Sequence, residues 1–134
     1  MYGKQKSLVM GNGGASKAIQ AVVKDKHPSQ MLIVDIIPSE NVLSIEDVYN
    51  NHKDVDVIIN TTPLGMYPKV EGCCVDFDKF TNISACLDVV YNPFYTEFAL
   101  QAKKRNILCV TGLEMLVAQA KYALEYFKDI SIEE

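Results

Sequence analysis

The sequence predicts an α/β fold in which helices cover both faces of a doubly wound, mostly parallel sheet. Three observations support this: short apolar runs alternate with longer amphipathic segments, the runs are rich in Val, Ile and Leu, and glycines follow the first run directly. Strands covered on both faces need apolar side chains at successive positions. Because 134 residues are enough for one ordinary core, we expect a single domain over residues 1–134.

About six strands are expected in this three-layer arrangement. Five of them are apolar runs of four or five residues, and a shorter one is expected at residues 41–43. Numbered along the chain, the six are expected to lie in the order 3-2-1-4-5-6, with the first strand near the centre of the sheet. The five longer candidates are residues 7–10, 31–35, 55–59, 85–89 and 107–110.

Helices are expected between these strands. Apolar residues recur at helical spacing over residues 15–25, directly after the glycines. Ser44 with Asp47 resembles a capping box, which would begin a short helix through Tyr49. The one long irregular stretch, residues 61–79, is rich in proline and glycine, and a loop of that length in a compact domain is usually functional.

Two further helices are expected in the last third of the chain. Thr96 is a suitable N-cap for a helix that ends near Arg105, where Asn106 can adopt the left-handed conformation that stops it. Thr111 with Glu114 is a second capping box, which would begin a last helix through about residue 127. Its apolar face is broad, so we expect self-association, as a homodimer through this helix.

Composition argues against several classes of partner. The net charge is −4 and the lysines are scattered, so we expect neither nucleic acid nor a membrane surface as a partner. No apolar run approaches the roughly 20 residues that cross a bilayer, and the N-terminus lacks the pattern of a secretory signal. We therefore expect a cytoplasmic protein.

The cysteines and histidines suggest no metal site. Cys73, Cys74, Cys86 and Cys109 have neither C-x-x-C spacing nor a nearby histidine, and we expect four free thiols. Both histidines lie in polar, charged stretches, where a solvated side chain is the ordinary interpretation.

A glycine-rich turn follows the first predicted strand. Gly11, Asn12, Gly13, Gly14 and Ala15 lie between this strand and the first helix, which is the context of a Rossmann-type dinucleotide-binding turn. There the first glycine permits a tight turn, the second permits close approach of a pyrophosphate, and the helix N-terminus attracts negative charge. The alternative is an ordinary strand-to-helix turn rich in glycine.

Asp35 favours the nucleotide-binding interpretation. It follows the second strand at about the spacing expected for a carboxylate that accepts hydrogen bonds from the hydroxyls of the adenosine ribose. The same carboxylate repels a 2′-phosphate, and Ile36 and Ile37 follow it instead of an arginine. The sequence therefore predicts NAD, with NADP as the alternative. The alternative is that Asp35 only caps the end of the strand and has no role in cofactor recognition.

Three further motifs follow the glycine turn along the chain. They are Asn-Thr-Thr-Pro-Leu-Gly-Met at 60–66, Asp-Val-Val-Tyr-Asn-Pro at 88–93 and Gly-Leu-Glu-Met-Leu-Val-Ala-Gln-Ala at 112–120. Together with the glycine turn, they resemble the C-terminal, nucleotide-binding part of the shikimate dehydrogenases. The resemblance spans nearly the whole chain, and the last three motifs are more specific than the glycine turn. It implies a shikimate dehydrogenase-like, NAD(P)-dependent oxidoreductase that interconverts shikimate and 3-dehydroshikimate in aromatic amino-acid and chorismate biosynthesis.

The resemblance also implies roles for individual residues. Thr61 would lie beside the cofactor, the backbone of Val89 and Gly112 would line the nicotinamide, and Met115 would pack on that ring. Tyr91 and Gln119 would hydrogen-bond the substrate. Taken alone, Tyr91 could equally be a half-buried aromatic and Gln119 a surface amide. Asn60 could serve only to shape the turn after its strand.

Two departures limit what the resemblance implies. Many family members have Asn-Arg-Thr after the second strand, where this chain has Asp35, Ile36 and Ile37. The catalytic lysine and aspartate of the family belong to an N-terminal domain of roughly a hundred residues that we expect to be absent here. No catalytic residue is therefore expected in this chain, which would be inactive alone. Shikimate and quinate remain open as substrates, as does a fragment of a larger enzyme or a non-catalytic nucleotide-binding or interaction module.

Overall fold

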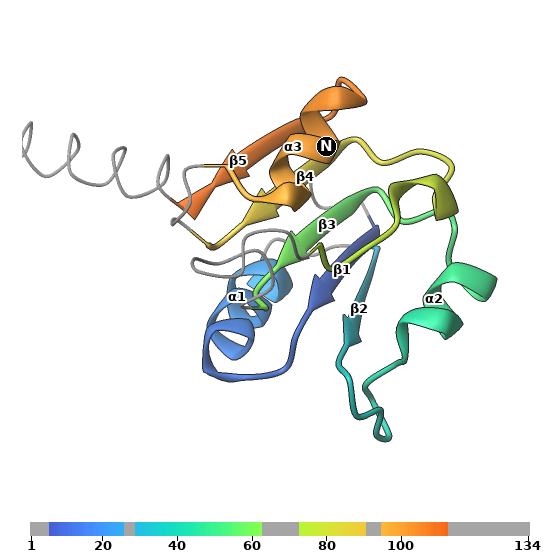
Figure 1. Cartoon of the computed structure of the whole chain (residues 1–134). Helices are drawn as coiled ribbons and strands as arrows, with labels where there is room; N and C mark the ends of the chain where they lie inside the picture. The colour runs from blue at the N-terminus through green and yellow to red at the C-terminus, as the bar shows by residue number, and fades with distance from the viewer. Residues whose placement is uncertain (1–5, 26–28, 63–72, 91–94, 113–134) are drawn as a thin grey trace, which may run out of the picture.

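A parallel sheet of five strands forms the centre of the molecule (Figure 1). The computed structural model describes residues 6–25, 29–62, 73–90 and 95–112. The strand order is β2-β1-β3-β4-β5, and every neighbouring pair is parallel. The strands are β1 (Lys6–Met10), β2 (Gln30–Val34), β3 (Val57–Asn60), β4 (Ala85–Asp88) and β5 (Leu108–Thr111).

The expected fold class is confirmed, with one strand fewer in the described residues. The short strand expected at residues 41–43 is reduced to a single parallel bridge between Leu43 and Val34. Its place beside β2 is nevertheless the one that the order 3-2-1-4-5-6 requires. The adjoining loop folds back on itself through an antiparallel bridge between Ser39 and Val42, which leaves too few residues for a longer ladder.

The helices begin and end close to the predicted positions. The elements are α1 (Gly14–Asp25), α2 (Ile45–Asn51), α3 (Glu97–Lys104) and a 3-10 turn, η2 (Phe77–Lys79), within the stretch expected to be irregular. The N-caps predicted at Ser44 and Thr96 are confirmed, since the Ser44 side chain accepts from the Asp47 amide and that of Thr96 from the Ala99 amide. Asn106 has the left-handed φ of 60° expected at the end of α3.

The predicted last helix and its dimer interface lie almost wholly beyond Gly112, outside the described residues. None of the described helices has the length and apolar character needed to cross a membrane.

Apolar cores lie on both faces of the sheet. Figure 1 shows α1 on one face and α2 and α3 on the other. On the α1 face, Val23 packs with Val9 and Ile59. On the opposite face, the fully buried Phe98 of α3 stacks on Phe77 of η2 with 5.4 Å between ring centroids. These packed faces hold the strand ends at one edge of the sheet, the carboxyl edge.

The last residues of the five strands lie side by side in one continuous row along the carboxyl edge. The register pairs Met10 with both Val34 and Asn60, Asn60 with Asp88, and Asp88 with Thr111. These are the last residues of the five strands, so every loop that follows a strand begins at this row. Open parallel sheets bind their ligands at this edge.

Candidate functional site

A cavity of about 580 Å³ opens at the carboxyl edge beside β1, β2 and β3. Its volume is within the range of small-molecule and cofactor sites. The residues that line it come from the glycine turn, the loop after β2, the start of α2 and the loop after β3. They are Met10, Gly11, Asn12, Gly13, Val34, Asp35, Ile36, Ser44, Ile45, Glu46, Thr61, Thr62 and Cys74.

The glycine turn is held from both sides by neighbouring strands. The Gly11 amide donates to the Val34 carbonyl at 2.7 Å. The Thr61 amide and hydroxyl both donate to the Met10 carbonyl, at 3.0 and 2.6 Å. Gly11 has a φ of 103°, and a Cβ there would lie 2.6 Å from the Thr61 hydroxyl oxygen. Both observations require glycine at this position.

Beyond Gly11 the backbone of the turn is not crowded by other atoms. A Cβ added at Gly13 or Gly14 would have no atom within 4 Å. Helix α1 begins at Gly14, and its first turn has no acidic residue to compete with a bound anion for the free amides. The arrangement fits a phosphate group at this helix N-terminus.

Ser16 holds the turn from beneath. This side chain is buried, donates to the Gly11 carbonyl at 2.6 Å and accepts from the side-chain amide of Gln20 at 2.9 Å. The same side-chain nitrogen of Gln20 also donates to the Asn12 side-chain oxygen at 3.3 Å. Ser16 occupies the position where dinucleotide-binding turns have a third glycine or alanine. The packing tolerates the Ser16 hydroxyl, which connects the turn to the helix.

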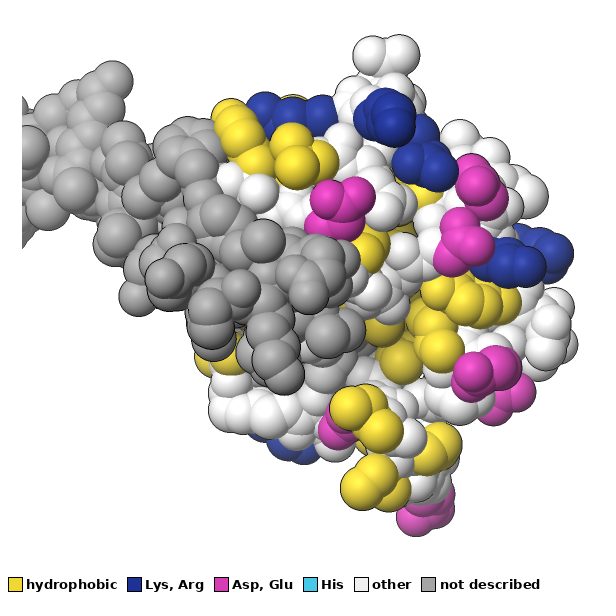
Figure 2. Space-filling view, in the orientation of Figure 1, with side chains coloured by type: hydrophobic (Ala, Val, Ile, Leu, Met, Phe, Trp, Pro, Cys, Tyr) yellow, Lys and Arg dark blue, Asp and Glu magenta, His cyan; other side chains and the backbone are white. Residues whose placement is uncertain are grey.

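Asp35 lies at the cavity wall directly after β2. Its amide donates to the Leu43 carbonyl at 3.2 Å, and one carboxylate oxygen accepts from the Ile36 amide at 2.7 Å. The side chain of Ile36 is 96% exposed and that of Ile37 is 79% exposed. Figure 2 shows hydrophobic side chains gathered on the loop that follows β2. Directly after the Asp35 carboxylate this rim is therefore apolar, at Ile36 and Ile37.

The structure brings five of the predicted cofactor-binding residues to one cavity, and these are Gly11, Asn12, Gly13, Asp35 and Thr61. Gly14 and Ala15 form the start of α1 but do not line the cavity.

Val89 and Gly112 are also neighbours, at the ends of β4 and β5. A Cβ on Gly112 would lie 2.4 Å from the Val89 carbonyl oxygen. Neither residue lines this cavity, so they belong to a more distant part of the carboxyl edge. The predicted sites at Tyr91, Met115 and Gln119 lie outside the described residues.

Sequence reasoning missed the wall formed by α2. Ser44, Ile45 and Glu46 line the cavity from the start of this helix, and Cys74 lines it from the segment before η2. Burial raises the pKa of the Cys74 thiol well above its ordinary value, so this group is a neutral, apolar part of the wall. All four cysteines are free, as expected.

A buried polar network holds together the ends of β3 and β4. The Asp88 carboxylate is fully buried and accepts from the Asn60 side chain at 3.3 Å, the Val90 amide at 3.0 Å and the Thr96 hydroxyl. Asn60 in turn accepts from the amide and hydroxyl of Thr62 at 3.0 and 2.6 Å. Asn60 therefore does more than shape a local turn, because it connects the cavity residue Thr62 to β4.

Comparison with known proteins adds an independent result. No protein-family model matches the chain. The shikimate dehydrogenase (NADP(+)) of Clostridium beijerinckii is 34% identical over an alignment of 134 residues, which covers 95% of this chain and 50% of that protein. The chain spans about half the length of the curated relatives it matches.

Solved structures agree with this relationship. A chorismate mutase/shikimate 5-dehydrogenase fusion protein from Clostridium acetobutylicum is 35% identical with a TM-score of 0.78, over 94% of this chain and 47% of that one. A shikimate dehydrogenase in complex with NADP⁺ is 27% identical with a TM-score of 0.60, over 87% of this chain and 46% of that one.

Proposed function

We propose that this chain, a homologue of the shikimate dehydrogenases over about half of their length, is the nicotinamide dinucleotide-binding domain of such an oxidoreductase. The observation that supports this most directly is the cavity itself. It combines an open glycine turn at a helix N-terminus with a carboxylate after the next strand. These are the two groups that a dinucleotide requires, one for its pyrophosphate and one for its ribose hydroxyls.

Each wall of the cavity has a role in this proposal. Gly11, Asn12 and Gly13, with the first turn of α1, hold the pyrophosphate, and Asp35 accepts hydrogen bonds from the adenosine ribose. Thr61 fixes the turn and lies beside the cofactor. The bound dinucleotide supplies the hydride chemistry.

The remaining predicted residues complete the site along the carboxyl edge. Val89, Gly112 and Met115 are proposed to line the nicotinamide, and Tyr91 and Gln119 to bind a shikimate-like substrate. Gly112 supports this in one respect: its hydrogen allows the backbones after β4 and β5 to approach each other closely. Oxidation of a substrate hydroxyl also needs a general base near that hydroxyl. We assign that base to the part of the relatives that this chain does not match, so this chain alone would bind the cofactor without turnover.

A calorimetric titration with NAD⁺ and with NADP⁺ tests the proposal. Binding of either dinucleotide is expected, and Gly13→Val should abolish it, because Gly13 lines the cavity and the proposal places the pyrophosphate against its backbone, where a larger side chain blocks close approach. Ala18→Val is the matched control, since Ala18 is an exposed residue of α1 that does not line the cavity. Equal binding by wild type and Gly13→Val would contradict the assignment.

A second measurement addresses the reaction. Incubation of the chain with NAD⁺ or NADP⁺ and shikimate should give no formation of reduced nicotinamide above background. A rate comparable with that of an intact shikimate dehydrogenase would show that the chain contains its own acid and base. Dinucleotide binding that never responds to shikimate, even when the remaining half of a shikimate dehydrogenase is supplied, would favour a non-catalytic nucleotide-binding module.

A further inference from the structure

Two carboxylates from different elements line the same cavity. Asp35 follows β2, and Glu46 lies in the first turn of α2. The Leu43 amide donates to the Ile33 carbonyl at 2.8 Å, and the Asp35 amide donates to the Leu43 carbonyl at 3.2 Å. These two bonds return the chain to the end of β2, so that α2 begins beside Asp35.

We propose that Glu46 is a second cofactor-specificity residue, which acts with Asp35 to select a dinucleotide with free ribose hydroxyls over one with a 2′-phosphate. This inference rests on the proposed function of the cavity. A 2′-phosphate carries a charge of about −1.5 to −2 at neutral pH. Among the described residues that line the cavity there is no lysine, arginine or histidine to balance it.

The two carboxylates have different roles in this proposal: Asp35 binds the ribose hydroxyls, and Glu46 repels a 2′-phosphate. One oxygen of Asp35 already accepts from the Ile36 amide, which fixes the carboxylate at the strand end and leaves the second oxygen for a ribose hydroxyl. Glu46 has no hydrogen bond of this kind among the described residues, and its side chain is exposed. Its main effect on a nucleotide is therefore its charge.

The expected size of the effect follows from electrostatics. At a separation of roughly 5 Å in an aqueous environment, one carboxylate disfavours a doubly charged phosphate by about tenfold in affinity. Because Glu46 is exposed, this part of the discrimination should weaken as salt is added. The relative from Clostridium beijerinckii is named as NADP⁺-dependent, so the proposal predicts that this chain differs from it.

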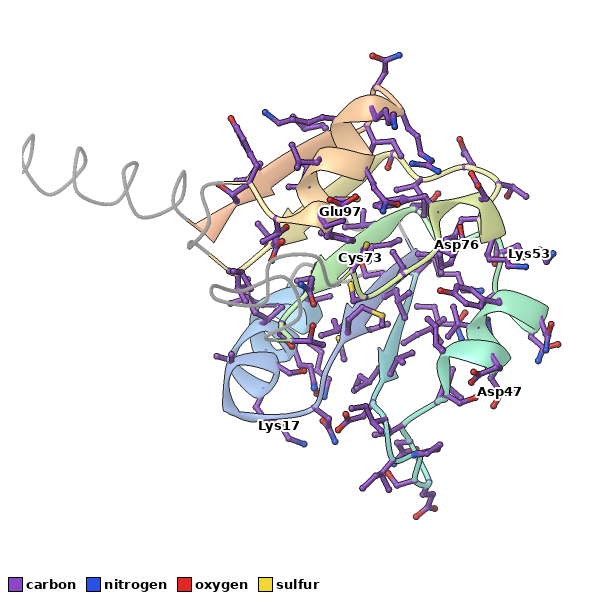
Figure 3. The ribbon with its side chains drawn as sticks, viewed as in Figure 1. Lys17, Asp47, Lys53, Cys73, Asp76 and Glu97 are labelled. Carbon is purple, nitrogen blue, oxygen red and sulfur yellow. The ribbon has the colours of Figure 1, made fainter. Side chains whose placement is uncertain are left out.

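The test uses the dissociation constants of NAD⁺ and NADP⁺ for the whole chain. The wild type should bind NAD⁺ at least about tenfold more tightly, and Glu46→Gln should tighten NADP⁺ binding by about tenfold while NAD⁺ changes less than about threefold. Asp47→Asn is the matched control, because it removes the same charge from the next residue of α2, which does not line the cavity (Figure 3).

Three other results would be decisive. Equal affinity of the wild type for both dinucleotides would overturn the proposal, as would equal changes in Glu46→Gln and Asp47→Asn. A wild type that binds neither dinucleotide would overturn the proposed function itself. Asp35→Asn distinguishes the two carboxylates, since it should weaken NAD⁺ binding as well as relieve the repulsion of NADP⁺, whereas Glu46→Gln should act mainly on NADP⁺.

Discussion

The Thr96 hydroxyl donates a hydrogen bond to the buried carboxylate of Asp88, and the same hydroxyl oxygen caps α3 by accepting from the Ala99 amide. One side chain thus connects the end of β4 to the start of α3. Residues 91–94, between these two elements, include the predicted substrate ligand Tyr91. The connection therefore links the described residues on either side of this segment.

Thr96→Val should destabilise the protein by about 2 to 4 kcal/mol. The substitution removes the N-cap of α3, which is worth about 1 kcal/mol, and leaves a buried carboxylate oxygen without its donor. Urea unfolding measures this difference. Thr81→Val is the control, because Thr81 is exposed and donates only to the Lys53 carbonyl, so its loss should change the free energy of unfolding by less than about 1 kcal/mol.

Asp88 should make the stability of the domain depend on pH. Burial raises the pKa of its carboxyl above the ordinary value, although hydrogen bonds from Thr96, the Val90 amide and Asn60 oppose the shift. The folded state then binds more protons than the unfolded state between the two pKa values. The protonated Asp88 carboxyl therefore contributes to the free energy of unfolding in full below its unfolded-state pKa. That contribution is lost as the pH rises through its folded-state pKa.

Asp88→Asn should remove the loss of stability that ionisation of Asp88 causes as the pH rises. An asparagine can still accept from Asn60 and Val90 through its oxygen, while its amide donates to the Thr96 hydroxyl oxygen. Urea midpoints measured from pH 3 to pH 8 should fall less steeply with rising pH in the variant than in the wild type. Asp25→Asn removes a charge at the exposed end of α1 and controls for net charge. Parallel curves for wild type and Asp88→Asn would refute the assignment.

Most of the fold could be predicted because its signals are local. Apolar runs and capping residues lie within a few positions of the elements that they specify, and the five strands were placed within two residues of their observed bounds. The short strand at 41–43 was only partly right, because its length depends on how the loop after Asp35 folds back. The 3-10 turn at Phe77 depends on packing against Phe98, which is remote in sequence.

In the candidate site, the residues that follow strand ends could be predicted from the sequence, whereas contacts between distant elements could not. Gly11, Gly13 and Asp35 follow strand ends directly, so their meeting at one edge followed from the parallel arrangement. The wall formed by Glu46 and its neighbours was missed, since it depends on how α2 is returned to the end of β2. The contact between Asn60 and Asp88 likewise requires knowing that β3 and β4 are neighbours in register.

Gly11→Ala should destabilise the fold by about 2 to 4 kcal/mol. A φ of 103° is costly for alanine, and its Cβ would overlap the Thr61 hydroxyl, which is itself bound to the Met10 carbonyl. Thermal unfolding measures the loss. Gly14→Ala is the control, because its Cβ meets no atom at the start of α1, so a gain of about 0.5 to 1 kcal/mol is expected. Equal losses in both variants would contradict the proposed geometry.

Ser16→Ala should weaken nucleotide binding as well as stability. The hydroxyl donates to the Gly11 carbonyl and accepts from Gln20, so its removal leaves a less rigid glycine turn and costs about 1 kcal/mol. Affinity for the preferred dinucleotide should fall about threefold to tenfold, because the turn must then be ordered on binding. Unchanged affinity together with reduced stability would mean that Ser16 supports the helix but not the turn.

Ser7 is the counterpart of Ser16, and the same substitution should have the opposite effect there. Its hydroxyl is fully buried in β1 and has no hydrogen-bond partner among the described residues, so the folded state bears the cost of removing it from water. Ser7→Ala should therefore raise the free energy of unfolding by about 1 kcal/mol. Ser7 lies away from the carboxyl edge, and nucleotide affinity should not change. Urea unfolding and calorimetry on the two alanine variants, measured side by side, separate a buried hydroxyl that holds the turn from one that only occupies the core. A loss of stability in Ser7→Ala as large as that in Ser16→Ala would show that the Ser7 hydroxyl has a partner.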